Sequence, residues 1–138
     1  MIDGERITMQ YAQQQQYLKV QVETANPGEL TLLLYQEINK LLLIAKKLYS
    51  QNQFEAMNEP LHKVRSILNE LIVTLNMEYD IARDLRKLYE FYSHYIAEFI
   101  IKKEAVMLDQ TLEFAKGMVA TWKQALMSLK TDGKQVHA

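Results

Sequence analysis

Residues 24–35 read TANPGELTLLLY, and this stretch predicts where the chain enters its first long helix. Asn26 can cap that helix, because its side-chain oxygen can accept hydrogen bonds from first-turn amides. Pro27 suits the first helical position, where an amide N–H has no partner, and Glu29 suits the third, from which it can reach back to the cap. Three separate signals therefore predict a helix that begins at residue 27.

Large apolar residues follow this start in alternating steps of three and four, which is the spacing of a buried helix face. The first segment has Leu30, Leu34, Ile38, Leu41, Ala45 and Leu48, and Leu33, Tyr35, Leu42 and Leu43 widen its stripe. The second has Phe54, Met57, Leu61, Val64, Leu68, Leu71 and Leu75. The third has Ile81, Leu85, Leu88, Tyr92, Ile96 and Phe99, broadened by Tyr89, Phe91 and Tyr95, and the fourth has Leu108, Leu112, Ala115, Val119, Trp122, Leu126 and Leu129. The pattern predicts four helices.

The start of the second helix is less clear than that of the first. Asn52 can serve as its cap, but Pro60 would remove a backbone hydrogen bond inside it. Either the first turns are kinked at Pro60, or the regular helix begins near Asn58.

The third helix is expected over about residues 80–102 and the fourth over about residues 105–130. Short connections force sequential helices to run antiparallel. The sequence therefore predicts an all-α fold, an antiparallel up-down-up-down four-helix bundle over residues 26–130.

The composition narrows the class of protein. The chain has 138 residues, 49% of them hydrophobic, with 4 Gly and 2 Pro, which suits one all-α domain and not a β-sandwich. With no cysteine, disulfides and thiolate metal sites are excluded. A net charge of −1 gives no general attraction for nucleic acid or an anionic membrane. The start of the chain does not resemble a signal peptide and no apolar run is long enough to span a membrane. We therefore expect a soluble, cytoplasmic protein that inserts into no membrane.

The two ends of the chain differ from the rest. Residues 1–25 hold a glutamine tract interrupted by Tyr11 and Tyr17 and followed by Val20 and Val22. Two interpretations stay open here. The segment is either a disordered tail with a little helix, or an arm whose tyrosines and valines dock weakly on an apolar groove of the bundle and can be displaced. The polar residues 131–138 are expected to form a frayed tail.

Catalytic and metal-binding patterns are scarce. Glu59 and His62 have the Glu-x-x-His spacing of di-iron bundles, but this motif occurs once instead of twice. A phosphotransfer bundle would need an exposed histidine inside a helix, and His94 is the candidate. His94 lacks the small neighbouring residues that would let a phosphoryl donor approach closely. A row of lysines (Lys116, Lys123 and Lys130) on one face of the fourth helix is more typical of a solvated surface than of a nucleic-acid site. We expect a non-enzyme with no metal, no cofactor and no nucleic-acid partner, and keep a histidine phosphotransfer bundle as the alternative.

Large, adaptable apolar side chains are more numerous than one buried apolar stripe per helix requires. The chain has 8 Tyr, 4 Phe, 7 Met and 1 Trp. Methionine repacks around varied partners and tyrosine tolerates half-burial, so the surplus favours a surface that binds an amphipathic helix or a disordered segment.

Several motifs resemble the FliS family of flagellar secretion chaperones. In chain order they are Tyr17-x4-Val22-x-Thr24-Ala25-x-Pro27-Gly28-Glu29-Leu30 running into Leu33-Leu34-Tyr35, then Leu71-x2-Thr74-Leu75-Asn76, Leu88-Tyr89-x-Phe91 and Trp122-Lys123-Gln124-Ala125. The resemblance covers roughly residues 11–130. It implies a bundle that binds the disordered C-terminal segment of newly made flagellin, prevents premature polymerisation and holds the subunit for the type III flagellar export gate. It also implies that the N-terminal arm occupies part of the same surface until flagellin displaces it.

The resemblance also implies which residues contact the partner. Tyr17 and Val22 are the candidates in the arm, and Leu33, Tyr35, Ile72, Tyr95 and Met118 are the candidates in the groove. The free protein is expected to be a monomer or a weak dimer. The sequence departs from the family pattern at Glu37, where many members have a small residue or glycine, and at Phe99 and Ile100, which replace an Ala-Asn pair.

Overall fold

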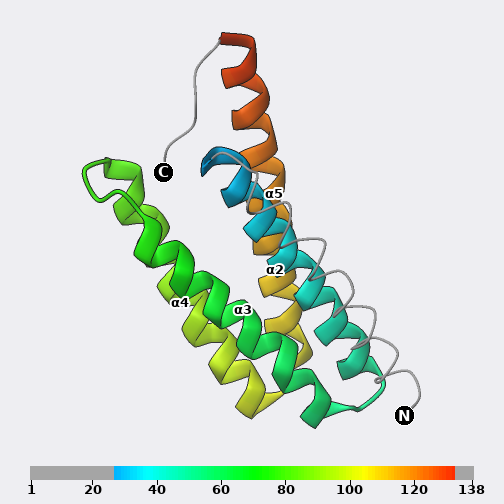
Figure 1. The fold of residues 1–138 in the computed structure, drawn as a ribbon. Coiled ribbons are helices and arrows are strands. Elements are labelled where there is room, and N and C mark those ends of the chain that lie inside the picture. The colour runs from blue at the N-terminus through cyan, green and yellow to red at the C-terminus, as the bar shows by residue number, and fades with distance from the viewer. Residues whose placement is uncertain (1–26, 133–138) are drawn as a thin grey trace.

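The computed structural model describes residues 27–132, which form four helices joined by short turns. These helices are α2 (Pro27–Ser50), α3 (Phe54–Thr74), α4 (Asp80–Lys102) and α5 (Ala105–Asp132). Sequential helices run in opposite directions (Figure 1), and the described residues contain no strand. The predicted all-α, antiparallel four-helix bundle is confirmed. The proposed docking of residues 1–25 lies outside the described residues, as does the predicted tail of residues 131–138 apart from Thr131 and Asp132, which belong to α5.

Helix α2 begins at Pro27, as the sequence predicts, and Glu29 lies in its first turn. The Thr31 hydroxyl donates a hydrogen bond of 3.2 Å to the Pro27 carbonyl. The Asn26 cap lies outside the described residues.

The predicted cap of α3 is wrong. The residue before the helix is Gln53, which makes no side-chain capping bond. Asn52 instead has a φ of 58° and donates its backbone N–H to the Tyr49 carbonyl at 3.0 Å. Asparagine tolerates this left-handed conformation better than most residues, so Asn52 closes the end of α2 instead of opening α3.

Helix α3 begins at Phe54 and includes Pro60 as an interior residue. This excludes the alternative in which the regular helix begins near Asn58. Pro60 is buried, together with the predicted core residues of α3 from Met57 to Leu71. Its ring therefore adds apolar surface to the core, whereas its missing N–H weakens the helix.

Each helix packs against two others: α2 against α3 and α5, and α4 against α3 and α5. The core contains the predicted apolar faces of α2 from Ile38 to Leu48, of α3 from Met57 to Leu71 and of the first half of α5. Leu43, which was predicted to widen the stripe of α2, is 52% exposed, so that prediction is wrong. Its fully buried large side chains are Tyr89, Phe99, Leu41, Leu42, Leu48, Met57, Leu61, Leu68, Ile96 and Val64. None of the helices in residues 27–132 is long and apolar enough to cross a membrane.

Helix α4 buries Leu85, Ile96 and Phe99 as predicted, but the rest of its buried face differs from the prediction. Ile81 and Leu88 are exposed, at 57% and 40%. The buried positions are Ala82, Leu85, Tyr89, Ser93, Ile96 and Phe99. The small side chains at 82 and 93 escape a search for large apolar residues, but they let α4 lie close to α3. Ser93 Oγ there accepts a hydrogen bond of 3.3 Å from Arg65 Nε.

The bundle is not closed evenly along its length. Figure 1 shows the α3–α4 hairpin diverging from the start of α2 and the end of α5, whereas the helices lie closer together at the opposite end. The half-buried side chains of the second half of α5, including Val119, Trp122, Leu126 and Leu129, belong to this open end. Within residues 27–132, these side chains are less buried than those of the core.

Candidate partner-binding site

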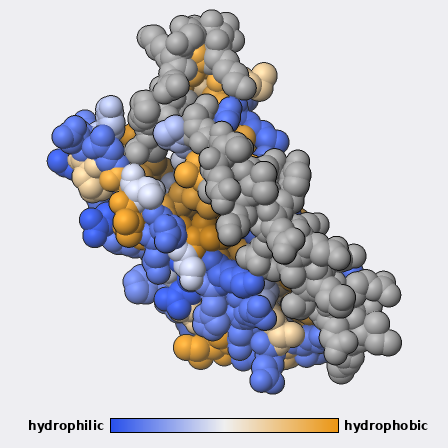
Figure 2. Space-filling model, in the orientation of Figure 1, coloured by the Kyte–Doolittle hydropathy of each residue, from blue (hydrophilic) through white to orange (hydrophobic). Residues whose placement is uncertain are grey.

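An apolar cleft lies between the helices, bounded by all four of them. Its lining consists of Tyr35 and Ile38 from α2, Leu68 from α3, Tyr89 from α4, and Phe114, Ala115 and Met118 from α5. Its cavity volume is about 10 Å³, which is room for about one water molecule. Figure 2 shows apolar surface in the middle of the face that it draws. We call this feature the central cleft.

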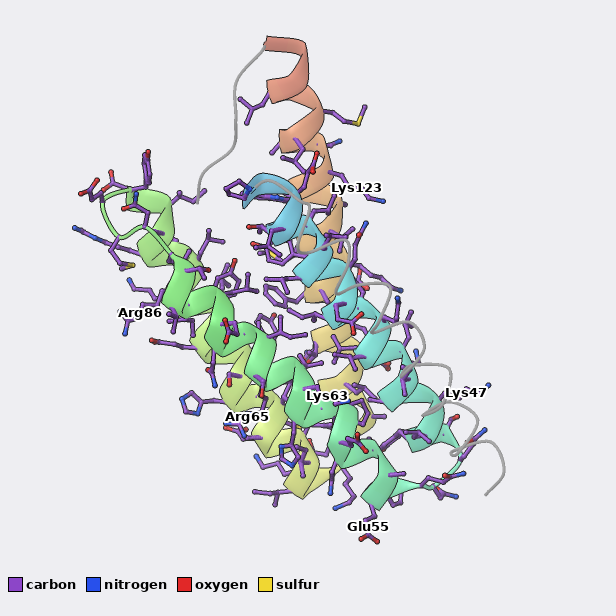
Figure 3. The ribbon with its side chains drawn as sticks, in the orientation of Figure 1. Lys47, Glu55, Lys63, Arg65, Arg86 and Lys123 are labelled. Atoms are coloured by element: carbon purple, nitrogen blue, oxygen red, sulfur yellow. The ribbon has the colours of Figure 1, made fainter. Side chains whose placement is uncertain are left out.

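Charged groups lie away from the central cleft. Arg86 on α4 and Lys123 on α5 point outward on opposite sides of the molecule (Figure 3), and both are exposed. Arg86 Nε pairs with Glu90 at 2.9 Å along the same helix. The cleft is therefore suited to apolar side chains and not to a charged ligand.

Two tyrosine hydroxyls are the polar groups of the cleft. Tyr35 and Tyr89 are buried, and their hydroxyl oxygens form a hydrogen bond of 2.5 Å between α2 and α4. Burial raises the pKa of Tyr35 well above its usual range, and the adjacent Tyr89 raises it further. Burial also raises the pKa of Tyr89, although its hydrogen bond with Tyr35 partly opposes the shift. Both phenols are therefore neutral at ordinary pH, and each provides the hydrogen-bond partner that the other needs.

Trp122 connects the open end of α5 to the start of α2. Its indole Nε1–H donates a hydrogen bond of 2.8 Å to the carbonyl of Gly28. Its ring meets Tyr35 edge to face, with ring centroids 5.9 Å apart. Trp122 and the tyrosine pair thus link three helices beside the cleft.

A second group of aromatic side chains lies where α4 meets α5. Phe114, from the cleft, stacks on Tyr92 with centroids 3.8 Å apart. Tyr95 stacks on Phe91 at 5.4 Å, and its hydroxyl donates a hydrogen bond to Gln110 of α5. Phe91 is 55% exposed. This aromatic cluster of Phe91, Tyr92, Tyr95 and Phe114 continues the apolar surface from the cleft to the outside of the bundle.

The structure brings together part of the predicted contact set. Tyr35 and Met118 both line the central cleft, with Tyr35 buried in its floor at 3% exposed. Ile72 is half-buried on α3, one turn after Leu68 of the cleft, and Tyr95 belongs to the aromatic cluster. Leu33 is half-buried on α2. Tyr17 and Val22 lie outside the described residues.

The sequence did not single out Tyr89 as part of the site. The available signal was its spacing from Leu85 and Ser93, four residues on either side, which places the three on one helix face. That signal was hidden because Leu88 and Tyr92 offer an equally apolar face one residue away.

The candidate metal-binding and phosphotransfer residues form no site in the part of the chain that the structure describes. Glu59, His62 and His94 are exposed. Within residues 27–132, no group of three His, Cys, Asp or Glu side chains is placed to hold a metal ion.

Comparison with known proteins shows which family the chain belongs to. Residues 9–129 match the family described as "Flagellar protein FliS". The chain is 31% identical over 116 residues to the flagellar secretion chaperone FliS of Bacillus subtilis (strain 168), covering 84% of this chain and 87% of the relative. It is 29% identical over 116 residues to the protein of the same description from Vibrio cholerae serotype O1, covering 80% of this chain and 85% of that relative. The chain therefore belongs to the FliS family of flagellar proteins.

Proposed function

We propose that this protein is an export chaperone that binds the disordered C-terminal segment of flagellin in the central cleft. By covering that segment it prevents premature polymerisation, and it delivers the subunit to the type III flagellar export gate. The observation that carries the proposal is an open apolar cleft in a chain that matches the FliS family over residues 9–129.

The chemistry of the cleft supports an apolar, partly helical ligand. Its lining is aliphatic and aromatic apart from the paired hydroxyls, and Met118 contributes a flexible side chain that can repack around different partners. A disordered segment that becomes ordered on contact loses conformational entropy, so its binding is weaker than the buried area suggests. Such binding suits a chaperone that must later release its cargo.

We also propose that residues 1–25 act as an arm that competes for the same apolar surface through Tyr17 and Val22. Competition by a tethered segment lowers the apparent affinity for flagellin, because the binding-competent state is then only part of the population.

The test is a titration of the C-terminal segment of flagellin, from the same organism, into two matched variants. Met118→Gln places a polar side chain of similar length in the cleft, whereas Met127→Gln makes the same change on the same helix at a side chain that is 69% exposed. Loss of one methionine contact is expected to weaken binding by about tenfold to a hundredfold in Met118→Gln, since such burial contributes about 1.5–3 kcal/mol and about 1.4 kcal/mol is a factor of ten. Met127→Gln should bind like the unmodified protein.

Equal affinity in both variants would show that the segment binds elsewhere on the molecule. No binding by the unmodified protein would contradict the proposed function itself. Circular dichroism of both variants ensures that a difference in affinity does not come from loss of helix.

A further inference from the structure

The central cleft is narrow in this structure. Its volume of about 10 Å³ holds about one water molecule, which is less than the space that one large apolar side chain of a partner occupies. Packed helices do not deform continuously, so a partner segment needs a movement that separates the elements around the cleft. Two lining residues, Phe114 and Met118, lie on α5 on either side of Gly117. A bend of α5 at this point would therefore widen the cleft.

Packing does not explain why residue 117 is a glycine. It lies inside α5, where glycine is less favourable than any residue except proline. A Cβ added there would meet nothing within 4 Å among the described residues outside its own stretch of helix. What glycine still provides at this position is backbone freedom, which is the property of a hinge.

The two halves of α5 around Gly117 are held differently. None of residues 118–129 is buried. Figure 1 shows the last turns of α5 extending beyond the start of α2. The buried residues of α5 within the described part all precede Gly117, and they are Met107, Leu108, Thr111, Leu112 and Ala115. The first half is thus fixed in the core, whereas the second half lies against its surface.

Helix α2 anchors the first half immediately before Gly117. Asn39 Nδ2 donates a hydrogen bond of 2.9 Å to the Ala115 carbonyl, and Lys46 pairs with Asp109 at 3.3 Å. A side chain bonded within the ladder of a helix is among the known causes of helix bending, as is glycine. Both features occur within one turn of α5.

Trp122 ties the second half back to the start of α2. Its indole Nε1–H bonds the Gly28 carbonyl at 2.8 Å, and its ring meets Tyr35 of the cleft edge to face. Trp122 is only half-buried. Its release would therefore break one hydrogen bond and part of an apolar contact without disturbing the core.

We infer that α5 bends at Gly117 to widen the central cleft for a partner segment, and that the hydrogen bond from Trp122 to Gly28 is the latch that opens. The inference rests on the proposed function and adds how the cleft admits its occupant. Because the open form is a minor part of the population, a stiffer hinge weakens binding and a weaker latch strengthens it.

The first test needs no partner. Trp122 is the single tryptophan of the chain, so hydrogen exchange of its indole N–H, followed by NMR, reports how often the latch opens. Gly117→Ala should raise the melting temperature by about 3 °C and slow this exchange by up to about fivefold, because alanine favours the straight helix. Ser66→Ala, at an exposed position of α3, also raises helix propensity but should leave the exchange unchanged.

Titration of the C-terminal segment of flagellin gives the second readout. Gly117→Ala is expected to weaken binding by up to about fivefold, whereas Ser66→Ala should bind like the unmodified protein. Trp122→Phe removes the N–H but keeps an aromatic ring. It should tighten binding several-fold while lowering the melting temperature, because the Gly28 carbonyl loses its donor.

Unchanged exchange in Gly117→Ala would overturn the inference, because the latch would then open without a bend at this residue. Slowed exchange with unchanged affinity would also overturn it, as would weaker binding by Trp122→Phe, which would make the indole a partner contact instead of a latch. Failure of the unmodified protein to bind the segment would remove the proposed function, while the exchange measurement would still decide whether α5 bends at Gly117.

Discussion

Tyr35 and Tyr89 show how a polar contact can be built into an apolar cleft. Each hydroxyl is buried, and each is satisfied by the other across 2.5 Å. The net contribution of such a hydrogen bond to stability is modest, whereas a buried hydroxyl that loses its partner is costly. The pair therefore fixes how α2 and α4 face each other at the floor of the cleft.

Removing both hydroxyls should cost less than the sum of the costs of removing each alone. Tyr35→Phe or Tyr89→Phe alone is expected to lower the free energy of unfolding by about 1–3 kcal/mol, because the remaining hydroxyl is buried without a partner. The double variant should be less destabilised than the sum of the two single variants. Urea denaturation of the four proteins measures this coupling, with Tyr79→Phe, at a 47% exposed residue, as a control. Strict additivity would show that the two hydroxyls do not depend on each other.

The same pair should affect stability at high pH. Burial raises the pKa of both phenols in the folded protein above the ordinary value of 10.0. The unfolded chain therefore loses these protons first, and the free energy of unfolding falls as pH rises above about 10, by up to 1.36 kcal/mol per unit for each group. Below that pH the contribution is fully present. Denaturation measured from pH 8 to 11 should show a steeper fall in the unmodified protein than in the Tyr35→Phe/Tyr89→Phe variant, and parallel curves would contradict the assignment.

At the scale of the elements, helix ends depend on local backbone geometry. The residue that closes α4, Lys103, has a φ of 57°, and its backbone N–H donates to the Phe99 carbonyl at 2.7 Å. A side chain with a Cβ is strained in this left-handed region, whereas glycine is not.

Lys103→Gly should therefore stabilise the protein by about 0.5–1 kcal/mol. The matched change Lys102→Gly, at the last residue of α4, should destabilise it, because glycine costs up to about 1 kcal/mol within a helix. Thermal unfolding of both variants checks the prediction. Lower stability in both would mean that the side chain of Lys103, which bonds the Ile100 carbonyl through Nζ, outweighs its backbone strain.

The existence and bounds of the helices could be predicted because they depend on local signals. Pro27 at the start of α2 and the three-and-four spacing of α3 are independent of the rest of the fold. The buried face of α4 could not be predicted in the same way, because it depends on which helix lies nearby. Asn52 was misassigned because the same residue type suits a helix start and a left-handed helix end.

The site could be predicted less completely than the fold. Tyr35 and Met118 were expected in a groove and line the central cleft. The hydrogen bond between Tyr35 and Tyr89 joins residues that are 54 positions apart, so no local sequence pattern predicts it.

At the scale of the whole molecule, the divergence of the helices connects fold to function. A bundle closed along its full length would bury its apolar side chains internally and leave little for a partner. Here all four helices contribute to a cleft that remains partly open. In the proposed function, this cleft is the apolar surface that receives the flagellin segment.

Removing the proposed arm should make that surface more available. Deletion of residues 1–22 is expected to tighten binding of the flagellin segment by several-fold, because a tethered competitor is lost. The four helices of residues 27–132 should remain intact, since none of them includes residues 1–22. Comparing the affinities of the full and shortened chains measures this effect. Weaker binding by the shortened chain would make residues 1–22 part of the binding site instead of a competitor.

The most direct test of the central claim is calorimetric titration of full-length flagellin, and of flagellin lacking its C-terminal segment, into this protein at several temperatures. The account predicts one-to-one binding of the full-length subunit with a large negative heat-capacity change, because apolar surface is buried in the cleft. It predicts no binding of the truncated subunit. Equal binding of both forms, or no heat of binding at any temperature, would contradict the claim that the cleft receives the C-terminal segment of flagellin.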